Sequence, residues 1–254
     1  NELPDLQARI QVALFNILEE GDVQIRGFKL RLPLDILFVF TANPEDYTNR
    51  GSIVTPLKDR IESQILTHYP KSLESALEIT GQEADINEEQ QSKVSISDMV
   101  KRLIEQVAFE ARSSEFVDKK SGVSARLTIS AFENAISSAE RRAILNNETH
   151  TQVWIADLAG IIPSVTGKVE LVYEGEQEGP YQVAMNLVDK AIRSTFVQYF
   201  PNPDTLKKRK SSESYRQGKP VQQEKEEENP YRSVINWFDK GNNLNISFST
   251  SDKD

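Results

Sequence analysis

Two side chains that lie close together in the sequence have the types and positions that nucleotide hydrolysis requires. Asn43 follows the apolar run 36–40, which predicts a buried strand, and Arg60 follows Asp59 a short distance downstream. In a sheet-based NTPase, an amide at a strand end holds the attacking water. An arginine on a projecting element stabilises charge on a neighbour's nucleotide. The segment 41–60 therefore predicts part of a nucleotide site.

This segment, TANPEDYTNRGSIVTPLKDR, resembles the sensor-1 strand and arginine-finger region of AAA+ ATPases. It is most similar to the magnesium chelatase ATPase subunit and MoxR-like group. The resemblance implies that Asn43 bonds the attacking water or the γ-phosphate, and that Arg60 reaches the γ-phosphate bound by the adjacent subunit. Ile61 stands where the family has Phe, and Arg50 is an alternative finger. The simpler interpretations are an Asn-Pro turn at Asn43 and a solvated or intramolecular Arg60.

The same resemblance assigns Glu2 and Arg126. Glu2 matches the glutamate that polarises the nucleophilic water, whereas Asn1 replaces a magnesium-binding aspartate by a neutral amide. This replacement weakens the case for magnesium binding and turnover. Arg126, in GVSARL, matches the sensor-2 arginine that holds the lid against the γ-phosphate. Simpler roles are a favourable acid at a helix start for Glu2 and a helix cap by Ser124 near Arg126.

The elements that would position these residues follow from periodicity. Apolar residues at helical spacing predict a helix over 3–20 that stops at Gly21. Alternation on both sides of Gly27 predicts a hairpin with one apolar and one basic face. Further helices are predicted over residues 73–82, 98–115, 131–145, 153–161 and 180–200.

The predicted fold class is α/β followed by all-α: the C-terminal part of a AAA+ core with a hairpin before sensor 1, then a helical lid. The expected pieces are the core over 1–70, the lid over 71–175, an additional amphipathic helix over 176–201, a flexible charged linker over 202–229 and a docking segment or poorly ordered tail over 230–254.

Composition narrows the function classes. The chain has 254 residues, a formal net charge of −9 and no cysteine. Disulfides and thiolate metal sites are therefore excluded, and a reducing cytoplasm is the expected location. The acidic balance argues against nonspecific nucleic-acid binding by the whole chain. No apolar run approaches the roughly 18 residues of a membrane span. His68 and His150 have no neighbouring ligand-like cluster, so no metal site is predicted.

No phosphate-binding loop of the form G-x-x-x-x-G-K-[ST] occurs in the chain. Gly167–Lys168 precedes Val169, and Gly218–Lys219 precedes Pro220, so neither pair offers the required hydroxyl. We therefore expect this chain to be the downstream part of an ATPase and to hydrolyse no ATP alone. The resemblance implies ATP and Mg²⁺ as the cofactors of the intact protein, a homo-oligomeric ring (a hexamer) and a partner protein that is remodelled or receives a metal ion.

Two alternatives remain open from the sequence. The missing phosphate loop and Asn1 both favour a noncatalytic interaction or regulatory module. A nucleic-acid-associated motor would instead use the basic hairpin face formed by Arg26, Lys29 and Arg31.

Overall fold

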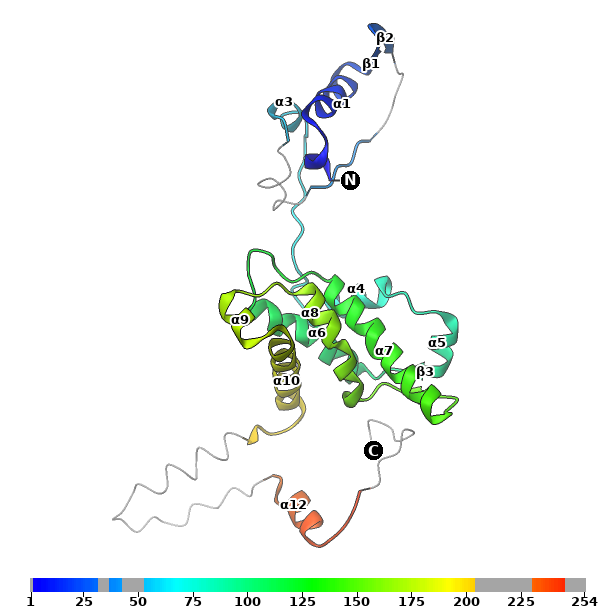
Figure 1. Ribbon diagram of the computed structural model, residues 1–254, viewed down its shortest axis with the longest axis vertical. Coiled ribbons are helices and arrows are strands. Elements are labelled where there is room, and N and C mark those ends of the chain that lie inside the picture. The colour runs from blue at the N-terminus through cyan, green and yellow to red at the C-terminus, as the bar shows by residue number, and fades with distance from the viewer. Residues whose placement is uncertain (1, 32–36, 43–52, 204–229, 245–254) are drawn as a thin grey trace, which may run out of the picture. The chain divides into compact units, whose positions relative to one another are not determined.

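The computed structural model describes residues 2–31, 37–42, 53–203 and 230–244 (Figure 1). The chain divides into two units, Asn1–His68 and Tyr69–Asp254. The described residues are mostly helical, with a two-stranded antiparallel sheet in the first unit and a two-residue parallel pair in the second. Which of these ranges act as a core and as a lid stays a prediction.

The first unit begins with a short 3₁₀ helix, η1 (Leu3–Asp5), and continues with α1 (Ala8–Glu20). The predicted helix is thus interrupted at Leu6, whose extended backbone is held by the Gln11 side-chain amide, 2.9 Å from the Leu6 carbonyl. The predicted stop is confirmed: Gly21 caps α1 in the left-handed conformation. The Gln11 amide oxygen also accepts the Val54 N–H at 2.8 Å, next to α3 (Thr55–Lys58).

The predicted hairpin is confirmed. β1 (Asp22–Ile25) pairs antiparallel with β2 (Phe28–Arg31). The connecting residues Arg26 and Gly27 both have positive φ, as the favoured two-residue hairpin turns require. The register places the apolar pairs Val23–Leu30 and Ile25–Phe28 on one face.

The predicted buried strand is wrong in its described part, because residues 37–42 belong to no strand. Leu37 is 88% exposed and Val39 is 77% exposed, while Phe38 and Phe40 are half-buried. A strand needs a neighbour that satisfies its backbone groups. Within the described residues, this segment makes a backbone hydrogen bond in which the Leu3 N–H donates to the Thr41 carbonyl at 2.9 Å. Ile36 lies outside the described residues.

The second unit is built from helices joined by short loops. They are α4 (Leu73–Glu83), α5 (Glu88–Lys93), α6 (Asp98–Ser113), α7 (Arg126–Asn146), 3₁₀ helix η2 (Ile155–Ile161), α8 (Ile162–Lys168), α9 (Tyr173–Glu178) and α10 (Pro180–Tyr199). Strands β3 (Val94–Ser95) and β4 (Thr151–Gln152) form the parallel pair.

One apolar core joins these helices. The predicted stripe of α6 is buried through Leu103, Ile104 and Val107, and it packs against α7 and α10. Val183, Leu187 and other residues of α10 lie in the same core, so α10 is part of the packed unit and not an appended element. Serine caps stabilise two helix starts, since Ser72 and Ser97 accept backbone N–H bonds at α4 and α6.

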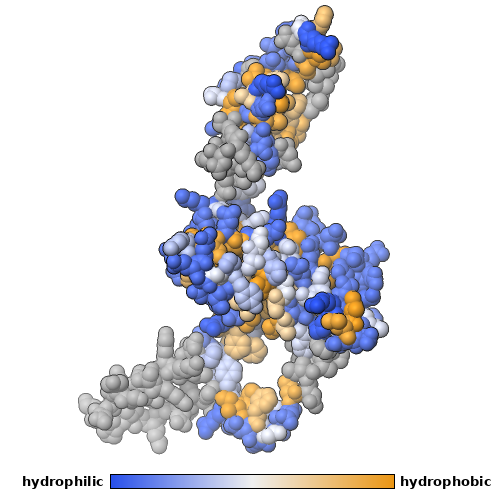
Figure 2. Space-filling view, in the orientation of Figure 1, coloured by the Kyte–Doolittle hydropathy of each residue, from blue (hydrophilic) through white to orange (hydrophobic). Residues whose placement is uncertain are grey.

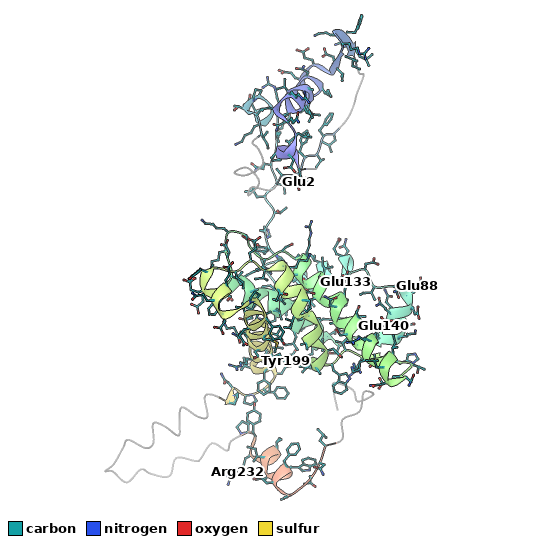
Figure 3. The ribbon with its side chains drawn as sticks, in the orientation of Figure 1. Glu2, Glu88, Glu133, Glu140, Tyr199 and Arg232 are labelled. Carbon is teal, nitrogen blue, oxygen red and sulfur yellow. The ribbon has the colours of Figure 1, made fainter. Side chains whose placement is uncertain are left out.

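Carboxylates of α7 hold the polar helix α5 and the loop before it. Glu133 accepts the Asp85 N–H at 3.0 Å, and Glu140 accepts the Gln90 side-chain amide at 2.8 Å. Figure 3 labels both carboxylates together with Glu88 of α5. Near the C-terminal end, the structure has a short helix, α12 (Arg232–Asp239). Its apolar residues are about half exposed: Val234, Ile235, Trp237 and Phe238. Figure 2 shows hydrophobic colour on the surface of this helix.

Candidate functional site

Glu2 stands at the start of η1 in a conformation that is uncommon for a residue with a side chain. Its φ of 53° and ψ of 61° are left-handed. The Glu2 N–H donates to the Thr41 hydroxyl at 3.0 Å, and the next residue, Leu3, donates its N–H to the Thr41 carbonyl. These bonds hold the Glu2 backbone beside Thr41, two residues before Asn43 in the sequence. The Glu2 carboxylate is exposed (Figure 3).

Asn43 itself lies outside the described residues, as do Asn1 and Arg50. The structure therefore brings Glu2 to the segment that leads into Asn43, and the role of the Asn43 amide stays a prediction.

Arg60 follows α3 and is engaged within its own chain. Its guanidinium contacts the Glu19 carboxylate of α1 at 2.8 Å and the Asp59 carboxylate at 3.0 Å. The hydrogen bond that Arg60 donates to Glu19, followed by the charge of Glu19, raises the pKa of Arg60, so the guanidinium is fully ionised. The side chain is still 39% exposed. Both partners are also exposed to water, which screens the attraction, so such pairs open readily.

Arg126 is the first residue of α7 and its side chain is exposed. Its backbone N–H donates to the Ser124 hydroxyl at 3.2 Å, and the Leu127 N–H donates to the Ser124 carbonyl at 3.0 Å. The N-cap position of α7 is Ala125 and no side chain caps it, so Ser124 is not the helix cap of the simpler interpretation. Ser124 instead forms a local turn that leads into the helix. Arg126 belongs to the second unit, and its convergence with Glu2 and Arg60 stays a prediction.

The basic face of the hairpin is partly neutralised. The Lys29 ammonium lies 3.3 Å from both the Glu20 and the Asp22 carboxylates. Their hydrogen bonds raise the pKa of Lys29. The other face exposes apolar side chains, with Phe28 80% exposed. Charge at this hairpin thus gives little support to a nucleic-acid interface.

The second unit contains a cavity that the sequence did not predict. Its volume is about 580 Å³, within the range of small-molecule sites, and residues of α4, β3, α6 and α7 line it. Glu105 of α6 lies on its wall and is only 2% exposed. Its carboxylate accepts the Thr80 hydroxyl at 2.5 Å, and the Thr80 and Thr128 hydroxyls lie 2.9 Å apart.

The burial of Glu105 has an electrostatic consequence. Desolvation raises the pKa of its carboxyl, and the hydrogen bonds from Thr80 and Thr128 and the charge of Arg112 oppose this shift. The sequence alone assigned no role to Glu105. The available signal was its position between the core residues Ile104 and Val107, with two threonines on other helices that only the fold brings near.

The described residues build no magnesium site. In residues 2–31, 37–42, 53–203 and 230–244, no group of three carboxylates or histidines gathers as metal ligands. Glu2 offers one carboxylate, which is fewer charged oxygens than a protein site for Mg²⁺ normally supplies. Among the described helices, none combines the length and apolar character needed to cross a membrane.

Comparisons with known proteins gave one structural likeness. No protein-family model matches the chain, and no curated protein matches it. Among solved structures, the chain is similar to the crystal structure of a proposed ATPase from Cytophaga hutchinsonii ATCC 33406, with 22% identity and a TM-score of 0.32. The alignment covers 74% of this chain and 63% of that protein's chain. At this TM-score the likeness carries no argument about the site.

Proposed function

We propose that this chain is part of a AAA+ ATPase of the magnesium chelatase and MoxR-like group. In this proposal the complete protein forms a ring and couples ATP hydrolysis to the remodelling of a partner protein or to metal insertion. Glu2 polarises the attacking water, Asn43 orients that water, Arg60 acts on the nucleotide of the adjacent subunit, and Arg126 senses the nucleotide from the helical unit.

The observation that carries the proposal is the contact between Leu3 and Thr41. It holds the backbone of Glu2 next to the segment that continues into Asn43. The proposed base therefore lies beside Thr41, two positions before the proposed amide in the sequence, although 41 positions separate Glu2 from Asn43. A water molecule polarised by one group and oriented by the other requires this arrangement.

The pairing of Arg60 with Glu19 is compatible with a role across a subunit boundary. A guanidinium bound to an exposed carboxylate can exchange it for a triphosphate, which carries more negative charge and suits its planar donors. Glu19 then serves as the resting partner of Arg60 between encounters with nucleotide.

Subunit mixing tests this proposal in the complete protein that contains the chain. Glu2→Gln and Arg60→Ala are prepared separately, and we expect each to bind ATP. We expect each alone to lose turnover, by roughly 10³–10⁵-fold for the arginine. Mixed rings contain interfaces at which an intact Glu2 meets an intact Arg60, so activity should reappear on mixing. Lys58→Ala, which removes a neighbouring exposed charge, is the matched control and should hydrolyse ATP normally.

The possible outcomes separate the alternatives. Recovery on mixing supports action across an interface. Two inactive variants that stay inactive when mixed would contradict that role of Arg60. An active Glu2→Gln variant would reject Glu2 as the base. A complete, unmutated protein without ATP turnover would favour the noncatalytic module instead.

A further inference from the structure

Tyr69 is the first residue of the helical unit, directly after the segment that connects it to the first unit. Its phenol oxygen accepts a hydrogen bond from the Val123 N–H at 2.9 Å. These residues are 54 positions apart. The contact therefore joins the point where the chain enters the helical unit to the loop that precedes α7.

Arg112 of α6 holds the other backbone polar group of the same residue. The Arg112 Nε donates to the Val123 carbonyl at 3.3 Å. Its guanidinium carbon lies 4.5 Å from the centre of the Tyr69 ring and 5.3 Å from that of Phe109. A cation over an aromatic face is attracted by the ring. Tyr69 and Arg112 thus fix each other, and between them they bind both the N–H and the carbonyl of Val123.

Gly122 makes this close approach possible. Its φ of +70° lies in the left-handed region that glycine adopts without strain. A Cβ at this position would lie 2.1 Å from the Tyr69 phenol oxygen, which is too close for any real contact. The Val123 side chain is only 1% exposed, so the loop is anchored in the core as well.

Val123, whose backbone is held in this way, lies three residues before Arg126. Between them, the Ser124 hydroxyl and carbonyl accept the N–H groups of Arg126 and Leu127, which starts α7. Few backbone torsions separate Val123 from Arg126, so the orientation of the Val123 peptide limits where the Arg126 side chain can reach.

We propose that Tyr69 is a positioning residue for Arg126, acting through the Val123 peptide. Displacement of the connecting segment moves the Tyr69 phenol, and with it the start of α7. The position of the segment between the two units is thereby coupled to the position of the predicted nucleotide sensor. This inference rests on the proposed function for the role of Arg126, whereas the Tyr69–Val123 linkage is a property of this chain by itself.

The linkage is tested first by amide hydrogen exchange of Val123 in this chain, measured by NMR. Tyr69→Phe keeps the ring over Arg112 but removes the acceptor oxygen, so exchange at Val123 should accelerate about fivefold to tenfold, as expected for one lost hydrogen bond. Tyr181→Phe, at a tyrosine that is 65% exposed, is the matched control and should leave Val123 unchanged. Equal exchange in Tyr69→Phe and the unmutated chain would overturn the proposal.

The positioning role is tested by a double-mutant cycle in the complete protein. The readout is the change in distance between labels on the two units when ATP is added. If Tyr69 acts through Arg126, Tyr69→Phe should reduce the change in the unmutated background and have no further effect in the Arg126→Ala background. Independent, additive effects would overturn the proposal.

One result would contradict the proposed function and leave the Tyr69–Val123 linkage intact. If Arg126→Ala leaves the ATP-dependent distance unchanged, Arg126 is not a nucleotide sensor. The positioning proposal then fails at its second step, even when Val123 exchange confirms the linkage. Gly122→Ala gives an independent check, because its added Cβ must displace the Tyr69 phenol and should accelerate Val123 exchange at least as much as Tyr69→Phe.

Discussion

Arg142 of α7 and Asp157 of η2 form a two-pronged ion pair, with Nε 3.1 Å from Oδ1 and Nη2 2.8 Å from Oδ2. The same guanidinium donates to the Thr151 hydroxyl at 3.0 Å and to the Gln152 carbonyl at 2.8 Å. The hydrogen bond and charge of Asp157 raise the pKa of Arg142. One arginine thereby ties α7 to β4 and to the following 3₁₀ helix.

Removing the charge of Asp157 should destabilise the helical unit. The Asp157 side chain is 8% exposed, so Asp157→Asn leaves the Arg142 guanidinium facing an amide in a poorly hydrated place. We expect a loss of about 2–4 kcal/mol in the free energy of unfolding, measured with urea. Glu89→Gln, which breaks the exposed pair with Lys93, is the control and should change stability little. Equal losses in the two variants would contradict a structural role for the Arg142 network.

Truncation of the buried stripe of α6 should cost more than truncation at the surface. Ile104 is 1% exposed and lies in the core between α6 and its neighbours. Ile104→Ala should lower the free energy of unfolding by about 2–5 kcal/mol, through lost apolar contacts and the space left behind. Ile144→Ala makes the same chemical change where the side chain is 67% exposed, and should cost well under 1 kcal/mol. Thermal or urea unfolding of both variants checks the difference.

The contrast between buried and exposed apolar side chains also explains which helices the sequence predicts. The spacing of Leu103, Ile104 and Val107 predicts α6 because one face of that helix is buried. Helix α5, EEQQSK, has no apolar stripe and no buried residue, so periodicity gives no signal for it. It is held by the Asn87 cap and by the Gln90–Glu140 bond, which joins residues 50 positions apart. Helix α7 starts five residues before its predicted start because Leu127 and Thr128 are buried there, and packing outweighs propensity.

In the candidate site, too, some features follow from the local sequence and others depend on how the helices pack. Residue type and local order predict Arg60 and Arg126, since both arguments use neighbouring positions in the sequence. The partner of Arg60 is Glu19, 41 positions away, and the partner of Tyr69 is Val123. Contacts at such separations depend on how the helices pack, which composition and periodicity do not specify. The predicted strand over 36–40 was wrong in its described part for the related reason that a strand depends on its neighbours.

Glu105 should make the helical unit less stable as pH rises. Its folded-state pKa is raised by burial, so the folded chain keeps this proton at pH values where the unfolded chain has lost it. The contribution of this group is therefore most favourable below the ordinary glutamate pKa of 4.5, and it declines until pH passes the raised value. The charge that acts on this carboxyl is that of Arg112, which opposes the effect of burial.

Glu105→Gln isolates this effect. Glutamine keeps an oxygen for the Thr80 hydroxyl and has no proton to lose in this range. The stability of Glu105→Gln relative to the unmutated chain should therefore increase from pH 4.5 upward and then level off. Urea unfolding at a series of pH values measures this difference. A difference that is independent of pH would mean that Glu105 titrates normally despite its burial.

The chain by itself should bind ATP weakly or not at all. No segment offers the loop of backbone N–H groups, lysine and hydroxyl that cradles phosphates, so exposed arginines alone would have to hold the nucleotide. Titration calorimetry of this chain with ATP and Mg²⁺ should give no micromolar binding. Micromolar affinity would mean that the phosphates are held by groups other than those proposed.

Arg126→Ala should separate nucleotide binding from the response of the helical unit. Arg126 is exposed at the start of α7, so its removal leaves the core intact and should change stability by less than about 0.5 kcal/mol. In the complete protein, ATP should still bind, but labels on the two units should no longer change distance when it does. Arg141→Ala removes an exposed arginine from the other end of the same helix and should respond normally. Because both variants lose one positive charge from α7, a loss of response in both would assign the effect to overall charge and not to the position of Arg126.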